Sequence, residues 1–351
     1  MNTLKLKTAV AESGQLQQVL HSRLFYPLLA LGLLLMFNLI TDPSFFAIEL
    51  KDGHLFGSVI DVLNRAAPVA LLAIGMTLVI ATGGIDLSVG AIIAISGATC
   101  AYLIEQQIVT STMAIISCGI LVAMLAGLWN GVLITMLGIQ PIIATLILMV
   151  AGRGIAQLIT NGQIVTFSHE GFEFIGGGFL FGLPFSIILV GLTYGLTYLL
   201  LKKTALGLFI ASIGANPVAS RYVGIKEPLI KILVYVFSGL CAGLAGMILT
   251  SDIQGADANN AGLWSELDAI LAVVIGGTAL TGGRYYIGTT LIGVLILQTM
   301  TTTILTNGLP VQFTHMVKAA VVILVMLVMS PKFRSELKSL SVSTKTSKGK
   351  K

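Results

Sequence analysis

Charged residues are scarce in this sequence. They make up only 10% of its 351 residues, whereas 56% are hydrophobic, and the mean hydropathy is +0.96. Soluble domains contain about 25% charged residues, so the composition excludes an ordinary soluble enzyme or binding domain. The apolar residues form runs of roughly 18 to 25, the length that a helix needs to cross about 30 Å of hydrocarbon. The sequence therefore predicts an all-α, polytopic membrane protein.

Cysteine and histidine are also rare. Cys100, Cys118 and Cys241 lie in apolar segments without CxxC spacing, which argues against a disulfide framework and against a metal site. The four histidines are far apart, and the motifs GxxxxGK(S/T), HExxH and GxSxG are absent. We therefore expect no catalytic residues, no metal ligands and no ATP hydrolysis by the chain itself.

Hydropathy predicts about ten membrane crossings, with both termini in the cytoplasm. Basic residues concentrate on one side of this layout, for example Lys5, Lys7, Lys202 and Lys203, whereas the opposite loops contain only Lys51. Cytoplasmic segments of membrane proteins carry this excess of Lys and Arg. The clusters also explain the net charge of +5 and favour contact with membrane lipid over nucleic acid. The expected crossings are residues 24–41, 59–82, 87–104, 111–135, 141–160, 184–201, 229–250, 266–281, 286–306 and 312–330.

Three regions are expected along the chain. Residues 1–23 are a cytoplasmic N-terminal leader, residues 24–330 are the transmembrane domain, and residues 331–351 are a basic, disordered cytoplasmic tail. No convincing cleavage site follows the first apolar run, so we interpret that run as a retained anchor and not as a signal peptide.

The inner loop, residues 202–228, is too long and too patterned to be a simple connector. Its spacing places Leu206, Ile210 and Ile213 on one side of a helix, and a second helix is expected to start near Asn216. Amphipathic helices of this kind dock into grooves on other proteins. The loop is therefore predicted to form a pair of short helices on the cytoplasmic face.

The stretch IATGGIDLSVGA, residues 80–91, interrupts two apolar runs. Irregular backbone within hydrocarbon is stable only where protein buries it or where it lines a wet cavity. Asp86, followed by Ser88, is placed to cap the next helix. Capping gains about 0.3 to 1 kcal/mol, against a cost of about 2.5 to 3.5 kcal/mol for an unpaired acid at mid-bilayer. We therefore expect Asp86 near the cytoplasmic interface, in a cavity or beside a cation, where it caps the helix or lines a pathway.

Other polar residues lie within predicted crossings. Asn130 and Gln140 are candidates for hydrogen bonds between helices. Arg153 lies between two glycines, and we favour a functional or inter-helix pairing role over snorkelling to the outer interface. For Lys318 snorkelling is the simpler interpretation.

The outer loop SDIQGADANNAGLWSELDA, residues 251–269, is acidic and rich in amides. Amides and carboxylates bind sugar hydroxyls, and an aromatic ring covers an apolar sugar face. The loop therefore suits a sugar or a polar protein partner, with a plain solvated loop as the alternative. The complete set of substrate-pathway candidates is Asp86, Ser88, Asn130, Gln140, Arg153, Asn259, Asn260 and Trp264.

One glycine pattern concerns helix packing. Glycines four residues apart permit close helix approach, and this applies to Gly127 with Gly131, Gly191 with Gly195, and Gly239 with Gly243.

Two segments of the sequence are similar to each other. ALLAIGMTLVIATGG (70–84) aligns without gaps with AILAVVIGGTALTGG (269–283). The similarity arises either by chance or from a repeat, and the expected layout would make such repeats parallel.

Four stretches together resemble the permease subunits of bacterial ATP-driven monosaccharide importers, the ribose, arabinose, xylose and galactoside group. They are GMTLVIATGGIDLSVGA, ATLILMVAGRG, ALGLFIASIGANPVAS and ELDAILAVVIGGTALTGGR, and the resemblance runs from about residue 58 to residue 330. Within this group, GSVIDVLNRAAPVALLAIGMTLVIATGGIDLSVGA and GADANNAGLWSELDAILAVVIGG are most similar to permeases of galactofuranose importers.

The resemblance implies a ten-helix permease in the bacterial inner membrane that binds no cofactor itself. Its partners would be a second permease of different sequence, cytoplasmic ATP-binding subunits that hold ATP and Mg, and a periplasmic sugar-binding protein. Sugar would cross by alternating access. The rival interpretations are an ion-coupled secondary sugar transporter and a membrane scaffold. The element facing the ATP-binding subunit would include Gly207, Ile213, Gly214, Asn216 and Ala219.

Overall fold

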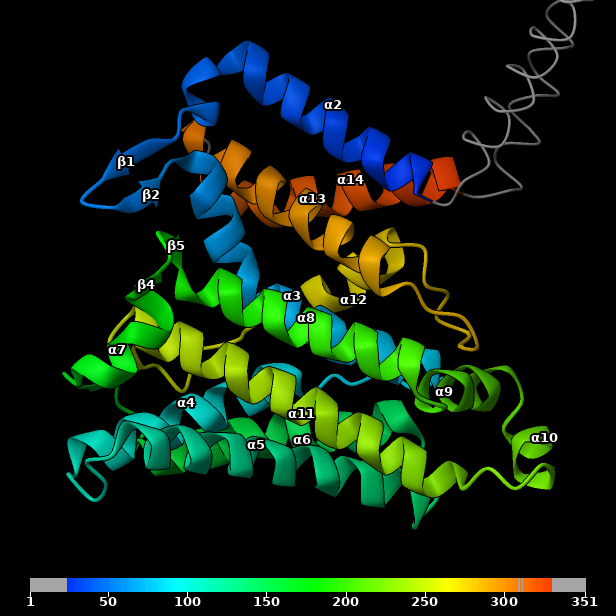
Figure 1. Cartoon of the computed structure of the whole chain (residues 1–351). Coiled ribbons are helices and arrows are strands. Elements are labelled where there is room, and N and C mark those ends of the chain that lie inside the picture. Colours follow the sequence, from blue (N-terminus) through cyan, green and yellow to red (C-terminus); the bar gives the residue numbers. More distant parts are fainter. Residues whose placement is uncertain (1–23, 309, 311, 330–351) are drawn as a thin grey trace, which may run out of the picture.

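The computed structural model of the chain describes residues 24–308, 310 and 312–329 (Figure 1). The expected leader and tail, residues 1–23 and 331–351, lie outside these ranges. The helices of the described chain are α2 (Phe25–Thr41), the short 3-10 helix η1 (Pro43–Phe46), α3 (Ser58–Ala81), α4 (Val89–Glu105), α5 (Thr112–Thr135), α6 (Pro141–Ile159), α7 (Glu170–Gly177), α8 (Phe185–Lys203), α9 (Leu206–Ala215), α10 (Pro217–Tyr222), α11 (Glu227–Asp252), α12 (Ser265–Ile275), α13 (Ile287–Thr306) and α14 (Gln312–Met329).

The strands are short and occur only in loops. Three antiparallel pairs are present in the described ranges. They are β1 (Glu49–Lys51) with β2 (His54–Phe56), β3 (Val165–Thr166) with β6 (Gly255–Ala256), and β4 (Phe179–Leu180) with β5 (Leu183–Pro184).

Six of the described helices, α3, α5, α6, α8, α11 and α13, are long and apolar enough to cross a membrane. The other predicted crossings fall on α2 and α4 with 17 residues each, α14 with 18 and α12 with 11. The helical membrane class is thus confirmed, while the number of ten crossings stays a prediction. The predicted extent 266–281 is wrong. The helix ends at Ile275 because Gly276 and Gly277 follow, and its length is only about 16 Å.

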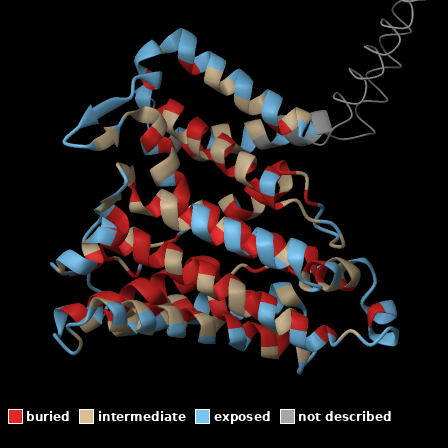
Figure 2. Ribbon diagram, in the orientation of Figure 1, coloured by how far each residue is buried: buried red, intermediate tan, exposed pale blue. Residues whose placement is uncertain are grey.

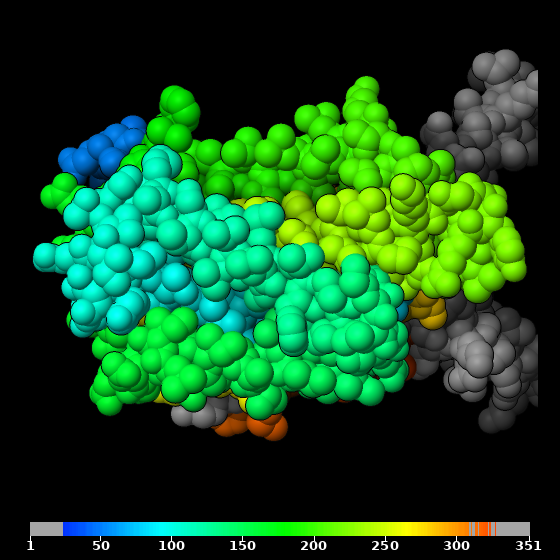
Figure 3. All heavy atoms as spheres, turned by 90° about the horizontal axis from the view of Figure 1, so that it is seen from below, coloured from blue at the N-terminus to red at the C-terminus, as the bar shows by residue number. Residues whose placement is uncertain are grey.

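The core lies where α3, α4 and α11 meet. The helix α11 packs against both α3 and α4, and it also packs along α5. Figure 2 shows the buried residues concentrated in this region. In Figure 3 the face seen from below is formed largely by α5, α6 and α11. Leu121, Ile147 and Leu158 are among the exposed apolar side chains of α5 and α6. This outer surface suits contact with lipid.

The elements sort to two ends of the bundle in Figure 1. The helices α9 and α10 lie at one end with the turn 276–286 and with both ends of the described membrane domain, near residues 24 and 329. The hairpin β1–β2, α7 and the hairpin β4–β5 lie at the opposite end. The two ends of the described membrane domain thus lie at the same end of the bundle as α9 and α10.

Glycines bring α5 and α11 into close contact. A Cβ atom on Gly239 would overlap the carbonyl oxygen of Ala123, and one on Gly131 would lie 2.9 Å from the Cα of Ile232. Close packing is thereby confirmed for the glycine pairs in α5 and α11. It is wrong for Gly191 and its partner four residues later in α8, because a Cβ there meets no atom within 4 Å.

The substitution Gly239→Ala should destabilise the protein, because the new methyl group overlaps the Ala123 carbonyl oxygen. Overpacking of this kind costs about 1 to 3 kcal/mol and lowers the Tm of the purified chain in detergent. The matched control is Gly191→Ala, which meets open space. Equal Tm values for the two variants would contradict the close packing of α5 against α11.

Candidate functional site

The helix break between α3 and α4 contains a buried polar network of Asp86, Ser88, Asn130 and Ser238. Asp86 Oδ1 accepts hydrogen bonds from the Ser88 backbone N–H at 3.0 Å and from the Ser88 hydroxyl at 2.6 Å, and Oδ2 accepts one from the Ser238 hydroxyl at 2.8 Å. The Asn130 amide donates to Ser88 Oγ at 2.8 Å. All four residues are fully buried. The network therefore joins the break to α5 and α11.

Asp86 lies deep in the bundle. Its partner Ser238 is eleven residues along α11 from Glu227, which is about 17 Å at 1.5 Å per residue. The prediction that Asp86 lies at the interface, in a cavity or beside a cation is therefore wrong in this conformation. Within the described chain it has no ion-pair partner and no exposed surface, because neutral donors satisfy its carboxylate. Asp86 binds Ser88, the N-cap residue, and no N–H group of the first turn of α4, so the predicted capping of this helix by Asp86 is wrong.

Two polar atoms near this network lack a partner within the described chain. They are Oδ1 of Asn130 and the hydroxyl of Tyr235. A Cβ atom on Gly84, in the break, would lie 2.5 Å from that hydroxyl. Buried groups of this kind are usually satisfied by water or in another conformation. The region thus retains unused hydrogen-bonding capacity.

Backbone contacts between three distant segments form a glycine junction, which we define as Ala81, Gly83, Gly214, Gly282 and Gly283. The Gly283 N–H donates to the Ala81 carbonyl at 3.0 Å. A Cβ on Gly214 would overlap that same carbonyl, and one on Gly282 would lie 2.9 Å from the Gly83 nitrogen. The junction therefore joins α9 to the ends of both TGG sequences.

The glycine junction also bears on the internal similarity. Gly83 and Gly282 occupy equivalent positions of the two aligned sequences, and both have a left-handed backbone with φ of +82°. Each follows a helix, α3 or α12, and the two glycine turns meet. The two aligned segments therefore end at the same place in the bundle, and the repeat itself stays a prediction.

Arg153 holds the outer loop against α6. Its Nη1 donates to the carbonyl oxygens of Ala258 at 3.1 Å and Ala261 at 2.6 Å. One helical turn further along, the Gln157 amide donates to Asn259 Oδ1 at 2.7 Å. Arg153 thus pairs with backbone carbonyls of the loop before α12 and not with another helix, and the functional role predicted for it stays a prediction.

Hydrogen bonds to the Asp257 side chain also stabilise the outer loop. Its carboxylate accepts hydrogen bonds from the backbone N–H groups of Asn259 and Asn260 and from the Asn260 side-chain amide. The amide bond to Asn260 contributes most to lowering the pKa of Asp257 below its usual range, so this acid is charged at neutral pH. The loop is thus ordered by its own polar residues.

Trp264 ends this loop and precedes α12. Its φ is +66°, an uncommon left-handed conformation for a large residue, and its side chain is half-exposed. It lines a cavity of about 430 Å³ together with Leu267, Leu271 and an ion pair between Asp268 and Lys318. The snorkelling interpretation of Lys318 is wrong, and Asp268 was not singled out. The charge of Lys318 within an apolar run is the signal that pointed to this pair.

The remaining pathway candidate, Gln140, is not brought near the others. It is exposed at the N-terminus of α6, and its side chain makes no hydrogen bond within the described chain. The cross-helix bond predicted there is therefore wrong, whereas the one predicted for Asn130 is confirmed. The candidates thus separate into a buried group at the break and an outer group around the 251–269 loop.

The predicted short helix pair is confirmed as α9 and α10. The side chain of Asn216 accepts a hydrogen bond from the Ala219 N–H at 3.0 Å, which caps α10. Of the coupling candidates, Gly207 and Ile213 are buried, Gly214 packs inward, and only Asn216 and Ala219 are exposed.

An exposed apolar face on α9 and α10, here called the coupling face, was missed by the sequence interpretation. Side-chain exposure, which the sequence does not report, distinguishes this face from the inward one. Its members are Leu208, Val218, Tyr222 and Val223. Glu227, the first residue of α11, anchors α10 through an ion pair with Arg221. It also pairs with Lys231, one turn further along α11, at 2.7 Å.

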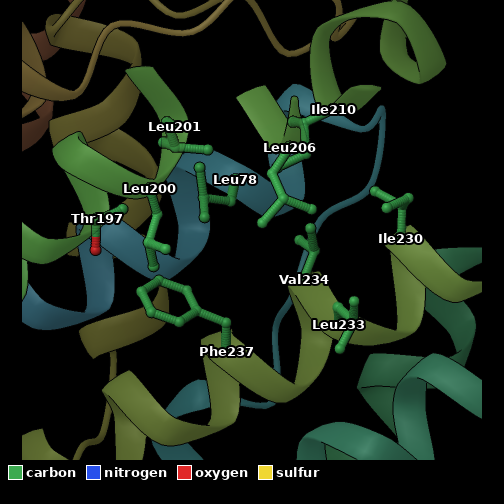
Figure 4. A pocket seen from close by; sticks show the side chains of 10 residues that line it. All are labelled: Leu78, Thr197, Leu200, Leu201, Leu206, Ile210, Ile230, Leu233, Val234 and Phe237. Atoms are coloured by element: carbon green, nitrogen blue, oxygen red, sulfur yellow. The ribbon is translucent and has the colours of Figure 1, made fainter. Parts of the chain in front are cut away.

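An apolar cavity lies beside α9. Its volume is about 180 Å³, and Figure 4 shows side chains from α8, α9 and α11 pointing into it, among them Leu206, Ile210 and Phe237. Such a space gives α9 room to shift against its neighbours. Within the described chain no group of three or more metal-ligating side chains lies together.

Asp86→Ala should destabilise the protein more than Asp86→Asn. Alanine leaves the Ser88 N–H and the Ser238 hydroxyl without a buried acceptor, and each unsatisfied group costs about 1 to 3 kcal/mol. Asparagine keeps an acceptor oxygen in nearly the same shape. Thermal unfolding in detergent measures the difference, and an equal loss in the two variants would contradict a structural role for these hydrogen bonds.

Comparison with known proteins gives a consistent result. Residues 58–326 match the family described as branched-chain amino acid transport system / permease component. The galactofuranose transporter permease protein of Escherichia coli K12 is 54% identical and covers 91% of this chain and 93% of its own length. The ribose import permease protein of Bacillus subtilis is 39% identical, with 86% and 91% covered. No solved structure matches the chain.

The name of a third relative includes the transporter class. The L-arabinose ABC transporter permease protein of Azospirillum brasilense is 34% identical, over 73% of this chain and 75% of the relative. These relatives give no support to the ion-coupled alternative. The resemblance seen in the sequence is confirmed, and the chain belongs to the family of transport-system permease components that its residues 58–326 match.

Proposed function

We propose that this chain is the permease of an ATP-driven importer that carries a monosaccharide, galactofuranose first among the candidates, from periplasm to cytoplasm. The observation that carries the proposal is the 54% identity to a galactofuranose permease along 91% of the chain. The ribose and arabinose permeases support the wider class of monosaccharides. The family description mentions branched-chain amino acids, but all three of these relatives are named for sugars.

The proposed assembly lies in the bacterial inner membrane, with ten crossings and both termini in the cytoplasm. The chain pairs with a second permease of different sequence and receives sugar from a periplasmic binding protein. ATP and Mg belong to the cytoplasmic ATP-binding subunits, and this chain performs no covalent chemistry. The membrane-length helices and the shared end for α9, α10 and the ends of the membrane domain support this arrangement.

Coupling starts at the exposed face of α9 and α10. The ATP-binding subunit contacts Leu208 and Tyr222 of the coupling face, which would otherwise leave large apolar side chains in water. On the opposite side of α9, Gly214 packs on the carbonyl of Ala81, and that carbonyl is bonded to Gly283. A shift of α9 therefore moves the end of α3 and the turn after α12 together.

The pathway runs beside the helix break and opens alternately to either side. The network of Asp86, Ser88 and Asn130 keeps the irregular backbone satisfied while the neighbouring helices move. The outer loop, with Asn259 and Asn260 on its surface, meets the incoming sugar. An uncharged sugar needs only weak binding here, because selection occurs in the binding protein.

Reconstituted vesicles test the class of transporter. The complete complex is placed in vesicles with radiolabelled sugar and binding protein on one side and ATP on the other, without any ion gradient. We expect uptake that requires ATP hydrolysis. Uptake driven by a proton or sodium gradient without ATP would contradict the proposal.

Tyr222→Asp and Leu208→Asp should weaken association with the ATP-binding subunit, because a charge would have to be buried in an apolar contact. Loss of a central apolar contact costs about 2 kcal/mol or more, roughly a thirtyfold loss of affinity, measurable by co-purification and titration in detergent. The matched control is Phe181→Asp, an exposed residue in the turn between β4 and β5 at the opposite end. Unchanged affinity in both coupling-face variants would contradict docking at this face.

A further inference from the structure

An ion pair between α12 and α14 is not fully covered by the chain. Lys318 Nζ lies 2.8 Å from Asp268 Oδ2, and the two side chains are 12% and 24% exposed. Lys318 is the only Lys, Arg, Asp or Glu in α14, whose sequence is otherwise dominated by apolar residues. The pair therefore places two charges on an otherwise apolar helix face.

This face is unsuited to lipid. Charged residues within membrane segments face the bundle interior, a partner or a water-filled cavity, because their exposure to hydrocarbon is costly. Lys318 is six residues from the start of α14, about 9 Å into the helix, and Asp268 is the fourth residue of α12. The remaining exposed surface of the pair accordingly requires water or polar ligand atoms.

The cavity in front of the pair has the composition of a carbohydrate site. Trp264, Leu267, Leu271 and Ala319 complete its lining. Its volume of about 430 Å³ lies within the range of roughly 300 to 1,000 Å³ typical of small-molecule sites. An aromatic ring covers the apolar face of a sugar, a carboxylate accepts hydrogen bonds from hydroxyls, and an ammonium group donates them. Trp264, Asp268 and Lys318 supply these three groups.

The aromatic wall is held in place by its backbone. The Trp264 carbonyl accepts hydrogen bonds from the N–H groups of Leu267 and Asp268 at 3.1 and 3.2 Å. Three residues earlier in the loop, Ala261 is bound by Arg153. The backbone of Trp264 is therefore held by the loop and by α12 together, so the ring starts from a fixed point on the cavity wall.

We propose that the cavity formed by Trp264, Asp268 and Lys318 is a monosaccharide subsite on a water-filled pathway. The subsite lies where the outer loop enters α12, so it receives sugar that arrives from the outer side. This inference rests on the proposed function and assigns the contacts of the transported sugar. Trp264 covers the sugar face, while Asp268 and Lys318 bind hydroxyl groups.

Cysteine labelling of the intact complex in vesicles tests the subsite. The three native cysteines are replaced by alanine, and Leu267→Cys or Leu271→Cys is introduced at the cavity wall. Leu121→Cys on the exposed surface of α5 is the lipid-facing control. A membrane-impermeant, water-soluble thiol reagent is applied with and without D-galactose, D-ribose, L-arabinose or D-fructose at millimolar concentration. Aqueous D-galactose contains some of the furanose form.

We expect the reagent to label both cavity cysteines and not the control, and at least one sugar to slow labelling severalfold. Absence of labelling at both cavity positions, in a complex that still transports, would show a face covered by lipid or by the second permease and would overturn the proposal. Labelling that no sugar slows would overturn the sugar contact. We measure in parallel whether uptake by the cysteine-free complex requires ATP. A failure of the proposed function would appear in this measurement and is thereby distinguished from a failure of the subsite.

A comparison of the two tryptophans of the chain gives a second measurement. Trp264→Leu should lower the rate of ATP-driven uptake about tenfold, as loss of a central aromatic contact does in other sites. Trp129→Leu, at a similarly exposed position on α5, serves as the control. Equal uptake by both variants, at equal amounts of assembled complex, would overturn the role of Trp264.

Discussion

The end of the bundle that contains α9 and α10 depends on one backbone contact, the hydrogen bond from the Gly283 N–H to the carbonyl of Ala81. Gly214 of α9 packs on the same carbonyl, where any side chain would overlap it. Three segments that are far apart in the sequence therefore meet without intervening side chains. Because close-packed backbone leaves no space for adjustment, these segments are suited to move as one body. A motion of the short helix α9 is therefore transmitted to the helix break and to the turn after α12.

The membrane imposes the second constraint, because irregular backbone and buried charge both need internal partners. At the break, Asp86 obtains them from Ser88 and Ser238 and not from a cation. In the irregular loop before α12, two backbone carbonyl groups are bound by Arg153. These polar residues thus stabilise non-helical backbone. The pair of Asp268 and Lys318 differs, since it faces a cavity.

Hydropathy and glycine patterns predicted the helical membrane class, the position of the break and the helix pair α9 and α10. These features depend on local composition, which a sequence displays directly. The depth of Asp86, the end of α12 at Ile275 and the outward direction of Gly191 were not predicted, because each depends on which neighbour packs against it. The ion pair of Lys318 was missed for the same reason, since its partner lies fifty residues away in the sequence.

Transport in this account is a motion of the glycine junction that changes access to a pathway between interrupted helices. The direct test is the distance across the junction, measured by paired spin labels at Val218→Cys in α10 and Leu280→Cys in the turn after α12, both exposed positions. The other cysteines are replaced, and the complete complex is compared without nucleotide and with ATP bound. The account predicts an unchanged distance between these labels while α9 moves relative to α5. Separation of the two labels by several ångströms on ATP binding would contradict it.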